Sequence, residues 1–162
     1  MADGTRRLVI LRHAKSAWPD GVPDAERPLN ARGRRDAPAA GRWLRDRGEH
    51  VDAVVCSPAA RTRQTWNLAA AVLSGLPAPV FDDRIYDATA DALLTVVSQL
   101  PDGAGQAVLV GHNPGVTELV ALLTGESPQM RTAAIAVLDL AGSWENAAPG
   151  SATLVAHATP RG

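Results

Sequence analysis

The sequence has little cysteine, few aromatic residues and no excess of either charge. Cys56 is the only cysteine among 162 residues, so an internal disulfide is excluded. Sixteen basic side chains stand against seventeen acidic ones, and this balance gives no global field to attract a nucleic-acid backbone or an anionic membrane. An anionic ligand must therefore be held by a local pocket. The four tryptophans are scattered and form no stacking ladder, so we interpret them mainly as core or loop-covering residues.

Long apolar runs are missing as well. No run approaches the roughly 20 residues needed to cross a bilayer, which excludes a membrane span. The N-terminal residues MADGTRR lead into a strand-like stretch, where a signal peptide would have an apolar core. We therefore expect a cytoplasmic protein whose partners include neither nucleic acid nor membrane.

The sequence does contain two kinds of segment that alternate along the chain. Short runs rich in Val and Ile alternate with longer stretches rich in Ala, Leu and Arg, a pattern typical of an α/β fold. The length predicts a single domain over residues 1–162. The expected strands are 8–11, 51–55, 107–110, 133–140 and 152–157, with a short edge strand over 77–81. The expected helices are 31–47, 59–73, 90–100 with Thr89 as N-cap, and one that begins at Pro114 after an Asn113 cap.

Polar residues follow three of the predicted strands. Arg12 and His13 come after the first strand, and His112 follows the strand 107–110. Arg61 lies in the first turn of the helix that follows the strand 51–55. In an open α/β sheet, ligands bind beyond the carboxyl ends of the strands, so parallel strands would bring these four side chains to one edge.

This set of side chains suits phosphoryl transfer. A neutral imidazole can attack phosphorus and form a phosphohistidine, which water then hydrolyses. Arginine grips two phosphate oxygens at once and keeps its charge. We interpret His13 as the nucleophile, with Arg12, Arg61 and His112 as an electrostatic clamp in which a protonated His112 would add charge. Helix N-termini near Asn113 and in the segment after Cys56 would add backbone donors.

Purely structural roles stay open for several of these residues. Arg12 could be a surface charge and Arg61 a helix salt bridge. Lys15 and Ser16 either flank the pocket mouth or stabilise a loop. A metal site built from the two motif histidines is disfavoured because neighbouring guanidinium groups would repel a cation, so we expect no metal and no cofactor.

The motifs together resemble the histidine phosphatase superfamily. The segment LRHAKS at 11–16 resembles its Arg-His-Gly signature, SPAARTRQT at 57–65 its second motif and VGHNP at 110–114 its third. RPLNARG at 27–33 is similar to the loop-to-helix entry of SixA-type phosphohistidine phosphatases. The resemblance implies a three-layer α/β/α sandwich with a mixed, mostly parallel central sheet, a phosphohistidine intermediate and no metal requirement.

Two departures from the family pattern bear on the substrate. Ala14 replaces the signature glycine, and no carboxylic acid occupies a clear leaving-group position, with Asp83 and Asp87 as the candidates. An imidazole leaving group needs less acid help than an alkoxide. The sequence also lacks long insertions that would cover a small substrate. The leading hypothesis is therefore phosphohistidine on a protein, with a small phosphorylated substrate, as in phosphomonoesterases and mutases, or a non-catalytic phosphate-binding role as alternatives.

Overall fold

One six-stranded sheet forms the middle layer of the protein, in the order β3-β2-β4-β1-β5-β6. The computed structural model describes residues 4–162, so the first three residues of the expected 1–162 domain lie outside the described residues. The strands are β1 (Arg6–Arg12), β2 (Ala53–Cys56), β3 (Val80–Phe81), β4 (Gln106–Gly111), β5 (Ile135–Leu140) and β6 (Ala152–Ala158). The helices are α1 (Ala31–Asp46), α2 (Ala60–Ala70), α3 (Ala90–Ser98) and α4 (Gly115–Thr124), with short 3₁₀ turns η1 (Asp24–Glu26), η2 (Asp83–Ile85) and η3 (Trp144–Asn146).

The sheet is mixed and mostly parallel, as expected. β3, β2, β4 and β1 pair in parallel, whereas β5 pairs antiparallel with both β1 and β6. β1 lies between β4 and β5, and the side chains from Leu8 to Leu11 are fully buried on both faces. A strand covered on both faces has no polar alternation, which is why the run reads as continuously apolar.

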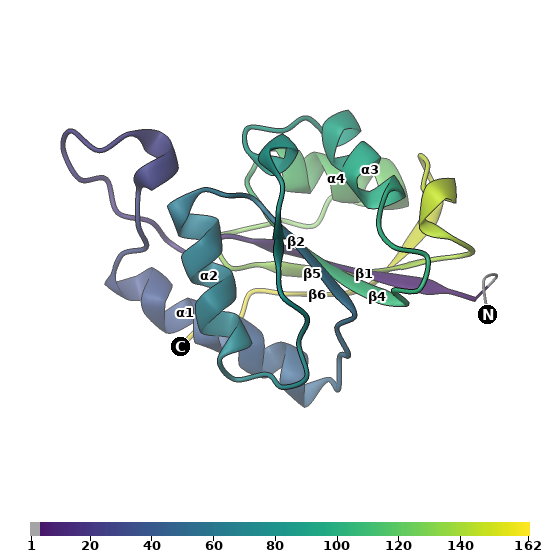
Figure 1. Cartoon of the computed structure of the whole chain (residues 1–162), viewed down its shortest axis with the longest axis horizontal. Coiled ribbons are helices and arrows are strands. Elements are labelled where there is room, and N and C mark those ends of the chain that lie inside the picture. The colour runs from purple at the N-terminus through teal and green to yellow at the C-terminus, as the bar shows by residue number, and fades with distance from the viewer. Residues whose placement is uncertain (1–3) are drawn as a thin grey trace.

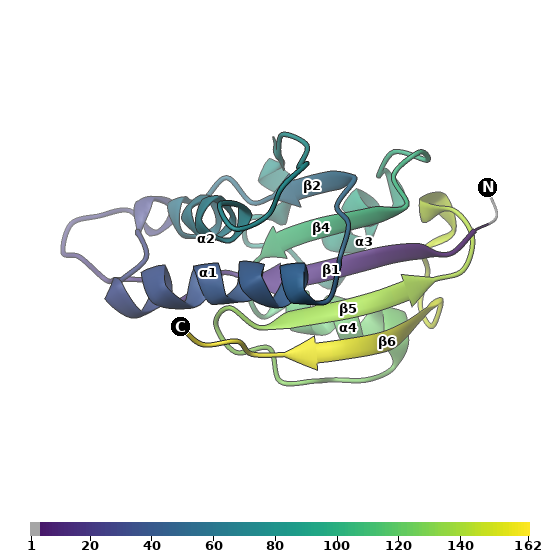
Figure 2. The same cartoon turned by 90° about the horizontal axis from the view of Figure 1, so that it is seen from below.

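Helices cover both faces of the sheet. Figures 1 and 2 show α1 and α2 on one face and α3 and α4 on the other, which confirms the three-layer sandwich. Two apolar cores fill the layers, one under α3 and α4 and one under α1 and α2. The helices α1 and α2 approach closely at Gly41, where an added Cβ would lie 2.2 Å from the carbonyl oxygen of Ala69.

Several helix ends differ from the expectation. α1 ends at Asp46 instead of residue 47, and α3 ends at Ser98 instead of residue 100. The helix expected over 59–73 ends at Ala70, and the chain then continues in turns. The prediction that Pro114 begins a helix is wrong, because α4 begins at Gly115 and Pro114 is the residue that flanks it. The Asn113 side chain still binds the beginning of α4, because its Oδ1 accepts a hydrogen bond from the backbone nitrogen of Thr117 at 3.2 Å. Thr89 is confirmed as the N-cap of α3.

The segment between β1 and α1 projects beyond the carboxyl ends of the parallel strands (Figures 1 and 2). This projecting loop, residues 13–30, is closed at its base by a bridge between Ser16 and Leu29 and carries η1 near its tip. Its place above the strand ends makes it one wall of the site. Among the described residues, no helix is long and apolar enough to cross a membrane.

Candidate active site

The carboxyl ends of β1, β2 and β4 converge on one cavity. Arg12 pairs with Gly111 in register, the backbone nitrogen of His13 donates to the carbonyl of Gly111 at 3.1 Å, and that of Ser57 donates to Val110 at 3.0 Å. These backbone bonds hold the three motif segments side by side. The cavity has a volume of about 230 Å³ and is lined by Arg12, His13, Lys15, Ser16, Trp18, Arg27, Arg61, His112, Asn113 and Thr132. All four residues of the predicted phosphoryl site therefore meet at one place.

His13 is held with one ring nitrogen bound and the other available. Its Nδ1 lies 2.7 Å from the carbonyl oxygen of Ala14. A carbonyl oxygen only accepts, so Nδ1 carries the proton and Nε2 keeps its lone pair in the neutral ring. Burial, with smaller contributions from the nearby His112, Arg12 and Arg61, lowers the pKa of His13 to about 3. His13 is therefore a neutral imidazole near neutral pH.

Ala14, the residue after His13, replaces the glycine of the Arg-His-Gly signature that the sequence resembles. The Ala14 side chain is fully buried and packs in a small cluster with Leu29, Ala37 and Ala133. Its backbone nitrogen donates to Oγ1 of Thr65 at 2.9 Å. The extra methyl group is thus part of the core and does not obstruct the cavity.

His112 lies beside His13, with ring centroids 5.3 Å apart. Its Nε2 shares a hydrogen bond with Oγ of Ser57 at 2.7 Å, while its Nδ1 has no partner among residues 4–162. Burial first, and then the charge of Arg61, lower the pKa of His112 to about 4. The cationic His112 considered from the sequence is therefore not the form present in the ligand-free site at neutral pH.

Arg12 is a half-buried cation with spare hydrogen-bonding capacity. Its Nη1 donates to the carbonyl of Met130 at 3.1 Å, and its buried Nε has no partner in the described chain. Burial lowers the pKa of Arg12, which remains a cation at any ordinary pH. Its charge meets no carboxylate among the described residues, which is the state expected of a guanidinium that awaits an anion.

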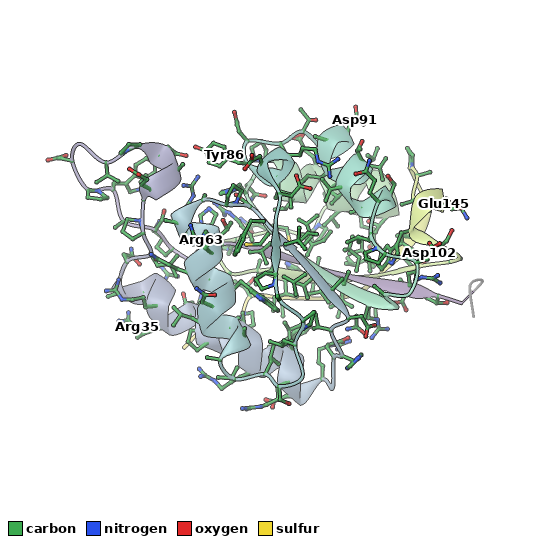
Figure 3. All side chains as sticks on the ribbon, viewed as in Figure 1. Arg35, Arg63, Tyr86, Asp91, Asp102 and Glu145 are labelled. Atoms are coloured by element: carbon green, nitrogen blue, oxygen red, sulfur yellow. The ribbon has the colours of Figure 1, made fainter. Side chains whose placement is uncertain are left out.

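Arg61 is paired with a carboxylate that sequence reasoning missed. Its Nη1 donates to the backbone carbonyl of Asp24 at 2.7 Å and its Nη2 to Oδ2 of the same residue at 3.0 Å. Oδ2 also accepts from the Tyr86 hydroxyl, and Oδ1 accepts from Nη1 of Arg27 at 3.0 Å. In Figure 3, Tyr86 lies between the projecting loop and the start of α3. The Tyr86 hydroxyl and the Arg61 guanidinium hold the pKa of Asp24 at about 2, so its carboxylate is ionised.

The lesser candidates divide into lining and supporting residues. Lys15 is exposed and lines the cavity. Ser16 is buried and its hydroxyl accepts from Arg27, so it also stabilises the loop. The Asn113 side chain reaches the cavity but is used within the protein, because its Nδ2 donates to the carbonyl of Met130 at 2.8 Å.

The two acid candidates lie in different places. Asp87 lines a second cavity of about 240 Å³, together with Asp24, Arg61, Tyr86, His112 and Asn113. Asp83 is exposed and lines neither cavity. The carboxylates that line these two cavities are thus Asp24 and Asp87.

Trp18 departs from the core or loop-covering role expected of the tryptophans. Its relative exposure is 76%, although it lines the cavity that contains His13. The guanidinium carbon of Arg27 lies 3.3 Å from the centre of its ring. This contact fixes one face of the indole and leaves a large apolar surface at the cavity mouth.

Within residues 4–162, no three His, Cys, Asp or Glu side chains are grouped so that they could hold a metal ion. Cys56 is buried at the end of β2, and burial raises the pKa of its thiol to about 12.

Comparison with known proteins defines the class. Residues 8–93 match the model of the histidine phosphatase superfamily (branch 1), and the chain belongs to this superfamily. The Mycobacterium tuberculosis protein Rv1276c is 38% identical over 163 residues, which cover 93% of this chain and 100% of that protein. Phosphohistidine phosphatase SixA of Escherichia coli is 32% identical over 145 residues, covering 83% of this chain and 85% of SixA.

Solved structures agree with the sequence relatives. A Nakamurella multipartitia structure assigned to phosphohistidine phosphatase SixA has a TM-score of 0.86 at 32% identity, with 99% of each chain covered. A structure of the protein histidine phosphatase SixA complexed with tungstate has a TM-score of 0.84 at 25% identity, covering 95% of this chain and 97% of that one. Family and fold together support phosphatase activity.

Proposed function

We propose that this protein hydrolyses phosphohistidine on a protein partner, with His13 as the nucleophile. Nε2 of His13 attacks phosphorus, the bond from phosphorus to the substrate imidazole breaks, and that imidazole leaves. Water then attacks the phosphoryl group on His13, which releases phosphate and regenerates the neutral ring. The observation that carries the proposal is the orientation of His13, whose Nδ1 is bound to Ala14 while the ring stays neutral beside two arginines.

The cations around His13 fit the charge of a phosphoryl group. Arg12 has an unpartnered Nε, and Arg61 extends from the first turn of α2, where the helix dipole adds positive potential. The unpartnered Nδ1 of His112 is a further group that a phosphoryl oxygen could bind. Donors fixed in advance in a half-buried site stabilise the developing charge without reorganisation. The similarity to a SixA complexed with tungstate supports the placement of an oxyanion here.

The carboxylates favour a leaving group that needs little acid. Asp24 is ionised, since the pKa of its carboxyl is held at about 2, and an ionised carboxylate is a poor proton donor. Asp87 lines the second cavity and not the one that contains His13. An imidazole departs from phosphorus with less proton help than an alkoxide does. Phosphohistidine is therefore a better match for this site than a sugar phosphate.

The mouth of the cavity favours a large substrate. Trp18 exposes an apolar surface at the rim of the cavity, and aromatic residues are enriched at protein interfaces. A protein that presents phosphohistidine on its surface can cover Trp18 while its phosphoryl group enters the cavity.

A side-by-side assay tests the substrate class. The purified protein is given equal concentrations of a phosphohistidine protein, a phosphoserine peptide, a sugar phosphate and phosphoglycerate, and kcat/KM is measured for each. We expect the phosphohistidine protein to be the best substrate. Equal or faster turnover of the sugar phosphate or phosphoglycerate would overturn the assignment in favour of a small-molecule enzyme.

A generic aryl phosphate separates catalysis from simple binding. Its leaving group also needs little acid, so the proposal predicts phosphate release that depends on His13. Phosphate binding without any release from the aryl phosphate or the phosphohistidine protein would indicate a non-catalytic phosphate-binding protein.

A further inference from the structure

Asp24 is ion-paired with Arg61, one of the arginines that line the cavity with His13. Its side chain is half exposed, yet it contacts the 9% exposed side chain of Arg61 through Nη2, while Nη1 of the same guanidinium binds its backbone carbonyl. Arg61 thereby points two donors at one residue of the projecting loop. Among the described residues, the Asp24 carboxylate is the negative charge with which Arg61 forms an ion pair.

The surroundings of Asp24 hold it in place. Its Oδ1 accepts from Arg27, whose Nε also donates to the carbonyl of Ala17 at 3.1 Å within the same loop. Its Oδ2 accepts from the Tyr86 hydroxyl on the far side of the cavity. Asp24 thus links the loop to α2 and to the segment before α3. It lines the second cavity, whereas Arg61 lines both.

A phosphoryl group bound by Arg61 would share that guanidinium with the Asp24 carboxylate. The two anions would attract the same cation and repel each other. This repulsion opposes the binding of every phosphate oxyanion, including the product, while the contact with Asp24 keeps Arg61 extended in the empty site.

We propose that Asp24 is a positioning residue that holds Arg61 in place in the empty site and competes with phosphate for it, so that product phosphate is released more readily. The inference rests on the proposed function in one respect, which is that Arg61 binds the phosphoryl group. It assigns to the projecting loop a role in the affinity for oxyanions, distinct from that of the nucleophile.

The substitution Asp24→Asn removes the negative charge of this side chain and keeps its shape. An asparagine retains an oxygen that can accept from Arg61, so the guanidinium stays supported. Removal of the negative charge is expected to lower the Kd for inorganic phosphate by roughly five- to tenfold, given partial exposure of the pair. The Kd is measured by titration calorimetry, and the inhibition constant of phosphate in the turnover assay should fall by the same factor.

Glu26→Gln is the matched control. Glu26 lies on the same 3₁₀ turn, is exposed and lines neither cavity, so the variant loses the same charge two residues away without removing a contact to Arg61. Its phosphate affinity should stay within about twofold of that of the wild type, because exposed charges at longer range are screened. The gain in Asp24→Asn should also shrink at high salt, which a merely structural effect would not do.

The possible results separate the two proposals. Tighter phosphate binding by Asp24→Asn but not by Glu26→Gln supports the competition. An unchanged or weaker affinity in a folded Asp24→Asn protein overturns it and leaves the proposed function intact. A wild-type protein that neither binds phosphate at millimolar concentration nor releases phosphate from the phosphohistidine protein or the aryl phosphate overturns both.

Discussion

The carbonyl oxygen of Lys15 lies 2.1 Å from the position that a Cβ atom on Gly33 would occupy. The first turn of α1 therefore packs directly on the loop that follows the nucleophile. The same carbonyl accepts from the backbone nitrogen of Asn30 at 3.0 Å, and Oδ1 of Asn30 caps the helix by accepting from Gly33 at 2.9 Å. The glycine of the RPLNARG segment is thus required by a backbone approach next to His13.

The close contact at Gly33 predicts the effect of a single methyl group. The methyl group added by Gly33→Ala would overlap the backbone carbonyl of Lys15. We therefore expect the free energy of unfolding to fall by about 2 kcal/mol or more. The loss is measured by urea denaturation. Gly103→Ala is the control, because nothing lies within 4 Å of its added Cβ. Equal stability of the two variants would contradict the packing at Gly33.

Histidine burial predicts how stability depends on pH. The folded pKa values of His13 and His112, about 3 and about 4, lie below the ordinary value of 6.5, so the unfolded chain binds more protons below pH 6.5. Stability is therefore complete above about pH 6.5 and falls as the pH decreases toward the folded values. Between pH 7 and pH 5 each histidine should contribute a loss of about 2 kcal/mol.

The variant His13→Asn isolates one of these contributions. Unfolding free energies of the wild type and the variant are measured at pH 7 and pH 5, and the wild type should lose about 2 kcal/mol more. A pH dependence that is the same in both proteins would show that His13 is not held neutral by the fold.

The exposed indole of Trp18 at the cavity mouth predicts that its loss affects KM for a protein substrate more than KM for a small one. Trp18→Ala should raise KM for a phosphohistidine protein by roughly three- to tenfold, the range expected for one lost aromatic contact. KM for a small aryl phosphate should change less. Phe81→Ala removes another exposed aromatic side chain, 46% exposed on β3 and outside both cavities, and serves as the control. If Trp18→Ala raised KM equally for both substrates, the indole would contact the phosphoryl end of the substrate and not the protein around it.

The buried thiol predicts resistance to alkylation. Because burial raises the pKa of Cys56 to about 12, the reactive thiolate is scarce at neutral pH. Treatment of the folded protein with iodoacetamide should leave turnover unchanged, and mass spectrometry should find Cys56 unmodified. Rapid modification with loss of activity would indicate a reactive cysteine in the mechanism.

Much of the site could be predicted because it lies at strand ends. The apolar runs of β1 and β4 reveal both strands, and parallel pairing then brings Arg12, His13 and His112 together by backbone geometry alone. Arg61 follows for the same reason, since it occupies the first turn of the helix after β2. Local pattern and fold topology therefore fix these positions without any knowledge of side-chain contacts.

Asp24 could not be predicted in this way. It belongs to an irregular loop, 37 residues from Arg61 and 62 from Tyr86, and only the folded path of that loop brings the three together. The one local signal is its spacing of three residues from Arg27, with which it forms an ion pair. The protonation state of His112 could not be predicted from the sequence either, because its pKa depends on burial and on the charge of Arg61.

The central claim is that His13 carries the phosphoryl group. The protein is mixed with a phosphohistidine protein labelled with ³²P, quenched within milliseconds to seconds, and the labelled residue is located by peptide mass spectrometry. We expect transient label on His13, and none on the folded His13→Ala variant, which should also be inactive. Label on another residue, or normal turnover by His13→Ala, would contradict this account.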